Sequence, residues 1–211
     1  MNPTRARAIA LRYFYLLRGS PARWLPLFIW VGIDILLWGF ITKYLNSVMA
    51  SPTLNFVPRL LGAVLIFDFF TRVLHGIASA FLEDVWSRNF LNVFASPLRI
   101  SEYLTGLVIT SVCTSMVGLA VMLLLAMGIF GLSFASYGVM LFPFLLILFL
   151  FGIALGIVGC SIVLRLGPAS EWFIWPIPAI ISPFVGVFYP LSTLPAWMQY
   201  ISKALPPSYV F

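Results

Sequence analysis

The sequence predicts an all-α protein that crosses a lipid bilayer several times. Of its 211 residues, 62% are hydrophobic and only 9% are charged, whereas soluble globular domains carry roughly 25% charged residues. Apolar runs close to the ~20 residues that a helix needs to cross the hydrocarbon layer recur along the chain. The two cysteines, Cys113 and Cys160, lie inside such runs and indicate neither a disulfide framework nor a metal site.

Five spans are expected within one transmembrane domain that covers residues 1–211. They comprise residues 24–42, 56–81, 103–130, 139–164 and 172–189. The third and fourth are separated by the stretch 131–138, whose glycines and serines are typical of a break between helices. The fifth contains Pro176, Pro178 and Pro183. Prolines at this density kink a helix, and a membrane tolerates them where neighbouring protein satisfies the freed backbone groups.

The basic residues predict the orientation. Arginine and lysine are enriched in cytoplasmic loops, and eight basic residues fall on the side of the N-terminus against three on the other. The first group is Arg5, Arg7, Arg12, Arg18, Arg23, Arg88, Arg99 and Arg165, and the second is Lys43, Arg59 and Lys203. We therefore expect a cytoplasmic N-terminus in the inner or plasma membrane. The net charge of +6 reflects this topology and predicts no nucleic-acid partner.

Two segments outside the spans have the composition of short helices. Residues 4–18 mix arginines with apolar side chains such as Ile9 and Phe14, which is typical of a helix in the cytoplasmic headgroup layer; a plain basic topology signal is the alternative. In residues 190–208, Pro195 favours the start of a short helix and Pro206 its end. This second segment is expected at the outer surface or dipping back into the membrane.

Four ionisable residues within the predicted spans are candidate functional groups, because such groups are costly in hydrocarbon. They are Asp34, Asp68, Arg72 and His75. Asp68 and Arg72 are four residues apart with the acid first, the favourable order for an ion pair on a helix. Asp34 and Arg72 lie at similar depths, so we also expect an interaction between them. Both a structural role, holding helices together, and a role in transport fit these residues.

Small residues in the fourth span indicate close helix packing. Gly152, Gly156 and Gly159 form a ridge that includes a GxxxG pattern. Such patterns let two helix backbones approach each other, although they are also common by chance in apolar segments.

The longest internal cytoplasmic segment, residues 83–102, mixes charged and aromatic side chains. Trp86, Phe90 and Phe94 recur every four residues and are expected to form the ridge of a docking helix. Glu83, Asp84 and Arg88 would flank this ridge. Ser96 and Pro97 are expected to cap and begin the helix that leads into the third span. A loop that floats at the membrane interface is the alternative.

The sequence contains no phosphate-binding Gly-rich loop ending in lysine, no HExxH and no CxxC. This chain is therefore expected not to be an enzyme and to carry no cofactor.

Three segments together resemble the permease subunits of type-2 ABC exporters. These are the basic N-terminus leading into the first span, the stretch EDVWSRNFLNVFASPLRISEYLTG, and the Pro-rich stretch FYPLSTLPAWMQYISKALPPSYVF. The resemblance implies a cytoplasmic coupling helix formed by Glu83, Asp84, Trp86, Arg88, Phe90, Phe94, Ser96 and Pro97. It further implies a permease dimer, most simply a homodimer, in the lipid bilayer and two separate ABC ATPase subunits that bind ATP. The family has six spans, whereas five are visible up to Phe211.

Two other functions are compatible with the residues alone. The first is an ion-coupled secondary transporter that uses Asp34, Asp68, Arg72 and His75 as a relay. The second is a membrane-embedded transferase. The absence of charges in spans three to five counts against the relay, and the absence of a clustered catalytic set counts against the transferase. The aromatic and apolar composition suits lipids, glycans and drugs alike as the transported substrate.

Overall fold

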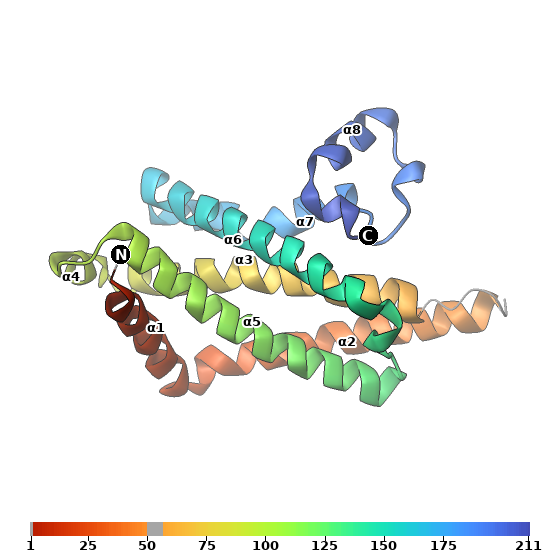
Figure 1. Ribbon diagram of the computed structural model, residues 1–211, viewed down its shortest axis with the longest axis horizontal. Coiled ribbons are helices and arrows are strands. Elements are labelled where there is room, and N and C mark those ends of the chain that lie inside the picture. The colour runs from red at the N-terminus through yellow and green to blue at the C-terminus, as the bar shows by residue number, and fades with distance from the viewer. Residues whose placement is uncertain (1, 50–56) are drawn as a thin grey trace.

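A computed structural model of the protein describes residues 2–49 and 57–211, and helices dominate throughout this part of the chain. Four long helices form a bundle along the long axis of the molecule (Figure 1). They are α2 (Pro21–Met49), α3 (Gly62–Trp86), α5 (Ile100–Phe130) and α6 (Leu141–Leu166). Each is long and apolar enough to cross a membrane. The predicted all-α, multi-span architecture is confirmed.

The observed helix ends differ from the predicted spans by several residues. Residue 56, where the second span was expected to begin, lies outside the described part of the chain. The described helix starts as a π-helical turn, Val57–Leu61, and continues as α3. The break expected at 131–138 is present, because Gly131 takes a left-handed conformation with φ 64° and ends α5. A 3₁₀ helix, Phe134–Met140, then leads into α6.

The central helix of the bundle is α3. It packs between α5 and α6, and the largest fully buried side chains include Phe69, Phe70 and Phe81 on this helix. On the α5 side, the Ser111 hydroxyl donates to the carbonyl oxygen of Val73 at 2.8 Å. The interior of the bundle is therefore organised around α3.

The glycine ridge of α6 faces α3. A Cβ atom built on Gly152 would lie 3.1 Å from Cβ of Val73, and one on Gly156 would lie 3.1 Å from Cβ of Ile77. Gly159 continues the ridge against Ile174. Contacts this tight are rare for a Cβ atom, and a side chain at these positions would force Val73, Ile77 or Ile174 to shift. The expected role of these glycines in close helix packing is therefore confirmed.

The expected fifth span does not form a continuous helix, which corrects the prediction for residues 172–189. This region contains the 3₁₀ helix Pro168–Phe173, the helix α7 (Ile177–Ile181) and the 3₁₀ turn Ser182–Phe184. Prolines lack the backbone N–H that a helix interior uses, and three of them fall between residues 176 and 183. The region is therefore divided into short helical pieces.

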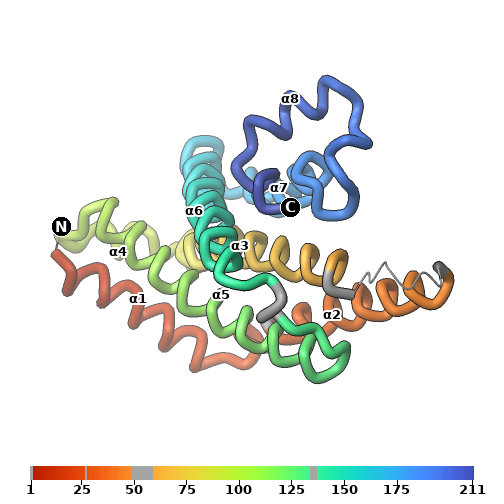
Figure 2. The backbone as a smooth tube through the Cα atoms, turned by 45° about the vertical axis from the view of Figure 1, so that its right-hand side comes forward, coloured from red at the N-terminus to blue at the C-terminus, as the bar shows by residue number. Residues whose placement is uncertain are grey.

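The C-terminal segment gathers on the α6 side of the bundle, away from α1 (Figure 2). Its main helix is α8 (Ala196–Ala204), which begins directly after Pro195 and ends before Pro206, as predicted. A short 3₁₀ turn, Leu191–Thr193, precedes α8 and another, Pro206–Tyr209, follows it. Phe188 stacks on Trp38 of α2 with 5.2 Å between ring centroids, and Phe211 contacts Phe67 of α3.

Replacing Gly156 by valine is expected to destabilise the bundle by about 1–3 kcal/mol, because the new side chain must displace Ile77 or the α3 backbone. The midpoint of thermal unfolding in detergent measures this effect. Gly32→Val in α2 is the matched control, since no heavy atom lies within 4 Å of the position of its Cβ. Equal midpoints for the two variants would contradict the assigned packing.

Candidate functional site

Four segments that are distant in the sequence meet at one end of the bundle. They are the N-terminal helix α1 (Pro3–Arg18), the end of α3, the short helix α4 (Phe90–Ala95) and the start of α5. Figure 1 shows α1 and α4 at this same end of the molecule. The segment predicted to couple the chain to a partner lies here.

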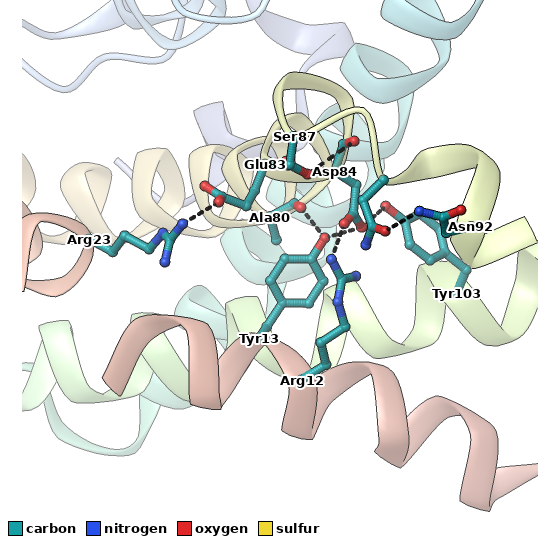
Figure 3. Close-up of polar contacts among 10 residues, drawn as sticks. Arg12, Tyr13, Arg23, Ala80, Glu83, Asp84, Ser87, Asn92 and Tyr103 are labelled. Atoms are coloured by element: carbon teal, nitrogen blue, oxygen red, sulfur yellow. Dashed lines mark hydrogen bonds and ion pairs between the residues drawn. The ribbon is translucent and has the colours of Figure 1, made fainter. Parts of the chain in front are cut away.

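Asp84 is the centre of this region and is fully buried. Arg12 of α1 donates from Nη2 to Oδ1 of Asp84. The hydroxyl of Tyr103 donates to Oδ2 at 2.8 Å, and the hydroxyl of Tyr13 also contacts Oδ2 (Figure 3). A buried carboxylate is tolerated only when it is paired and hydrogen-bonded. Here Arg12 of α1 forms the ion pair, and Tyr13 of α1 and Tyr103 of α5 provide hydrogen bonds.

Tyr13 joins α1 to the backbone of α3 as well. Its hydroxyl lies between Oδ2 of Asp84 and the carbonyl oxygen of Ala80, and its single proton can be donated to either. Burial, together with the neighbouring Tyr103 and Asp84, raises the pKa of the Tyr13 phenol, so it remains a donor. The hydrogen bond to Asp84 raises the pKa of Arg12. Both α1 groups therefore keep the protonation state that binds Asp84.

A second buried carboxylate, Glu102, holds the beginning of α1. Its Oε1 accepts from the backbone N–H of Asn2 at 2.7 Å, and its Oε2 accepts from the N–H of Arg99 at 3.1 Å. The Arg5 guanidinium lies 3.6 Å from Oε2 and donates to the carbonyl oxygen of Pro97. The beginnings of α1 and α5 are thus bound to one carboxylate.

Close backbone contact completes the attachment of α1. A Cβ atom on Gly106 of α5 would lie 2.5 Å from Cγ2 of Ile9, so only glycine permits the approach. A more exposed pair, Arg23 with Glu83 at 2.6 Å, links the start of α2 to the end of α3. Together these contacts join α1, α2, α3 and α5 at one end.

The predicted docking ridge of Trp86, Phe90 and Phe94 does not form as one helical face, which corrects the expectation. Helix α3 ends at Trp86, and Arg88 adopts a left-handed conformation with φ 53° that turns the chain before α4 begins. Phe90 and Phe94 then point inward and contact the ring of Tyr103, with centroid distances of 6.2 and 5.3 Å. The most exposed apolar side chain of α4 is Leu91, at 82%.

Ser96 and Pro97 lie in the connection between two helices, so the expected helix start at these residues is also wrong. Ser96 is the C-cap of α4 in an extended conformation, and its hydroxyl donates to the carbonyl oxygen of Val93 at 2.6 Å. Helix α5 starts three residues after Pro97, at Ile100. The Glu102 carboxylate caps that start by accepting from the N–H of Arg99.

Trp86, the last residue of α3, instead contacts the segment that follows α6. Its Nε1–H donates to Oε2 of Glu171 at 2.6 Å. Glu171 belongs to the 3₁₀ helix Pro168–Phe173, which follows α6. The end of α3 and the segment after α6 are therefore in direct contact.

The residues that sequence reasoning missed are the partners of the predicted ones. Arg12, Tyr13, Tyr103 and Glu171 all bind members of the 83–102 segment, at sequence separations of 19 to 85 residues. Pattern analysis of one chain gives no signal at such separations.

The four intramembrane polar residues lie in two different surroundings. Arg72 donates from Nε to Oδ2 of Asp68 at 2.6 Å, which confirms the pair expected from their spacing, and Asp34 lies within electrostatic range of both. The His75 ring packs against Trp175 at 5.0 Å, and its Nε2 is buried with no hydrogen-bond partner among the described residues. A direct Asp34–Arg72 interaction stays a prediction.

Asp84→Asn is expected to lower the stability of the fold by about 2 kcal/mol, because it leaves the Arg12 charge without its partner. Arg12 keeps partial exposure, which places the effect below that of a completely buried pair. The exposed pair is the control, and Arg23→Gln with Glu83→Gln should cost at most about 1 kcal/mol. Thermal unfolding in detergent compares them, and a larger loss in the control would refute the central role of Asp84.

The Asp34–Arg72 prediction is tested by a double-mutant cycle with Asp34→Asn and Arg72→Gln. If the two groups interact, the double variant should be more stable than the sum of the single effects predicts, because a lone charge in hydrocarbon is worse than none. The cycle of Asp34→Asn with the distant Arg12→Gln should be additive. Additivity in both cycles, within about 0.5 kcal/mol, would reject the interaction.

Comparison with protein families agrees with the resemblance seen in the sequence. The family model described as ABC-2 type transporter matches residues 21–211, from the first residue of α2 to the end of the chain, and α1 precedes the match. No individual curated protein matches the chain. Membrane subunits of this family lack ATPase activity, carry no cofactor and work with an ATPase partner. The chain belongs to the ABC-2 type transporter family and is a multi-pass membrane subunit of an ABC transporter.

Proposed function

We propose that this chain forms the substrate pathway of an ATP-driven exporter as a homodimer, and that residues 83–102 receive the movement of a separate ATPase subunit. The observation that carries this proposal is the convergence on Asp84. An exposed short helix lies beside a buried polar centre that binds two spanning helices. A force applied to α4 therefore acts on α3 and α5 together.

The path of this force runs through the inward face of α4. Phe90 and Phe94 contact Tyr103, and the hydroxyl of Tyr103 binds Asp84 at the end of α3. The connection between α4 and α5, which contains Pro97, is short, because α4 ends at Ala95 and α5 begins at Ile100. Movement of α4 thus displaces the first turn of α5 through aromatic contacts rather than through a flexible loop.

The docking surface in this proposal is the outward face of the same segment. Leu91, exposed at 82%, would fill an apolar groove of the ATPase, as apolar helix residues do in helix-in-groove recognition. Trp86 and Arg88 are exposed beside it. Glu83 and Asp84 act inward in this arrangement, by holding α2 and α1, and do not set partner choice.

The distribution of charge supports a cytoplasmic position for this end of the bundle. Arg23 lies in the first turn of α2 and Arg165 in the last turn of α6, while Arg88 follows the end of α3 and Arg99 precedes the start of α5. Because consecutive long helices cross the membrane in opposite directions, these four positions share one side. Arginines near helix ends favour the cytoplasm, which gives α1 and the N-terminus the same location.

A dimer is proposed because the pathway of such a subunit would lie between two copies. Much of α2 is exposed, including Trp30, Leu37 and Phe40, and lipid together with a second copy accounts for this surface. The exposed walls are aromatic and apolar, which suits a substrate with a large apolar part.

The test is affinity purification of the tagged chain in mild detergent. Wild type should recover an ATPase in equal numbers, in a complex whose mass fits two copies of each subunit. Leu91→Asp should reduce ATPase recovery and export at least about tenfold, since it removes an apolar side chain whose burial is worth about 1.5–3 kcal/mol and places an unpaired carboxylate in the groove. Val139→Asp is the matched control, because Val139 is also 82% exposed but lies at the opposite end of the bundle.

Normal ATPase recovery and export in Leu91→Asp would remove α4 as the docking surface. Failure of the wild-type chain to recover any ATPase would contradict the proposed complex itself. Membrane insertion of both variants is checked by their yield and unfolding midpoint, which should match wild type.

A further inference from the structure

Helix α1 has two opposite faces with different surroundings. Ala6, Ile9 and Tyr13 form the face that is buried against the bundle. The opposite face remains exposed and consists of Arg7, Leu11, Phe14, Tyr15 and Arg18. Leu11 and Phe14 are more than half exposed, at 55% and 57%. Side chains three and four residues apart lie on one side of a helix, so this outward face is continuous from Arg7 to Arg18.

The outward face carries two arginines that form no ion pair within the described part of the bundle. Arg12 is paired with Asp84 and Arg23 with Glu83. Arg7 and Arg18 have no hydrogen-bond or ion-pair partner among the described residues, and α1 contains no acidic residue. Two free arginines therefore flank an exposed apolar and aromatic stretch.

The connection to α2 keeps α1 near a membrane surface. Only Gly19 and Ser20 separate the end of α1 from the start of the first spanning helix. At such a position, apolar side chains enter the boundary between headgroups and acyl chains, and arginines extend to the phosphates. Charge complementarity then favours anionic over zwitterionic lipid.

We propose that the outward face of α1 (Arg7, Leu11, Phe14, Tyr15 and Arg18) binds anionic phospholipid, and that lipid bound there holds the opposite face of the same helix on Asp84. The lipid and Asp84 occupy opposite faces of one helix and favour the same position, so each strengthens the other. Lipid charge thereby regulates the site that the proposed function uses for coupling. Only the choice of the cytoplasmic leaflet rests on that function.

The test uses the purified full chain in nanodiscs without any ATPase, so its outcome is independent of export. Phosphatidylcholine is replaced stepwise by phosphatidylglycerol, and hydrogen exchange of the amides of α1 and of the end of α3 is measured. Exchange in both segments should slow as the anionic fraction rises, with each arginine contributing roughly fivefold. Arg7→Gln with Arg18→Gln should remove most of this slowing.

The control variant is Arg88→Gln with Arg165→Gln, which removes two exposed arginines at the same end of the bundle but outside α1. It should respond to phosphatidylglycerol as wild type does. An equal loss of response in the control would overturn the assignment to α1. Slowing of α1 without slowing at the end of α3 would overturn the link to Asp84.

Two further arms separate the lipid from other anions and from proteins. Inorganic phosphate added to phosphatidylcholine nanodiscs should have no effect, and slowing by phosphate alone would show a free-anion site. Slowing of α1 by the ATPase in phosphatidylcholine nanodiscs that persists in Leu91→Asp, which lacks the α4 docking contact, would show that protein covers this face. Either result would overturn the lipid proposal.

Discussion

A carboxylate without access to water has to be surrounded by donors, and Asp84 imposes this requirement on one end of the molecule. Arg12, Tyr13 and Tyr103 satisfy it, and in doing so they fix the position of α1 and the first turn of α5 relative to α3. An apolar residue at the same place would pack, but it would not select these partners. The attachment of α1 and α5 to the end of α3 therefore depends largely on one charge and its hydrogen bonds.

The spanning parts of the bundle are held together by close helix packing and by interhelical hydrogen bonds. Within a bilayer, lipid tails compete equally with apolar side chains, so association of helices depends on close packing and on interhelical polar contacts. Gly152 and Gly156 supply the close packing between α6 and α3, and Ser111 supplies a hydrogen bond between α5 and α3. The buried ends and the spanning parts of the chain are thus stabilised by separate interactions.

This division has a functional consequence under the proposed coupling scheme. The polar end is built from a few directional contacts, which respond to small displacements of α4 or α1. The spanning parts are close-packed and move as rigid helices. Signals from an ATPase on α4 and from lipid on α1 would then meet at Asp84, where both α1 and α5 are attached, before they reach the membrane interior.

Much of the architecture follows from the sequence because it depends on local periodicity and composition. The four long spans, the break after Phe130, the short helix between Pro195 and Pro206 and the Asp68–Arg72 pair all involve residues within one helix or one turn. The pair illustrates the reason: a spacing of four residues on a helix determines that two side chains meet, whatever surrounds them.

The tertiary structure alone decided which helix meets each face. The partners of Asp84 are up to 72 residues away, and no local pattern reveals them. Phe90 and Phe94 have the spacing of an outward ridge, yet the left-handed turn at Arg88 directs them onto Tyr103. The apolar length of residues 172–189 suits a span, but their prolines divide them into short pieces. Sequence periodicity determines which side chains share a face, whereas the direction of that face depends on turns and on contacts between distant segments.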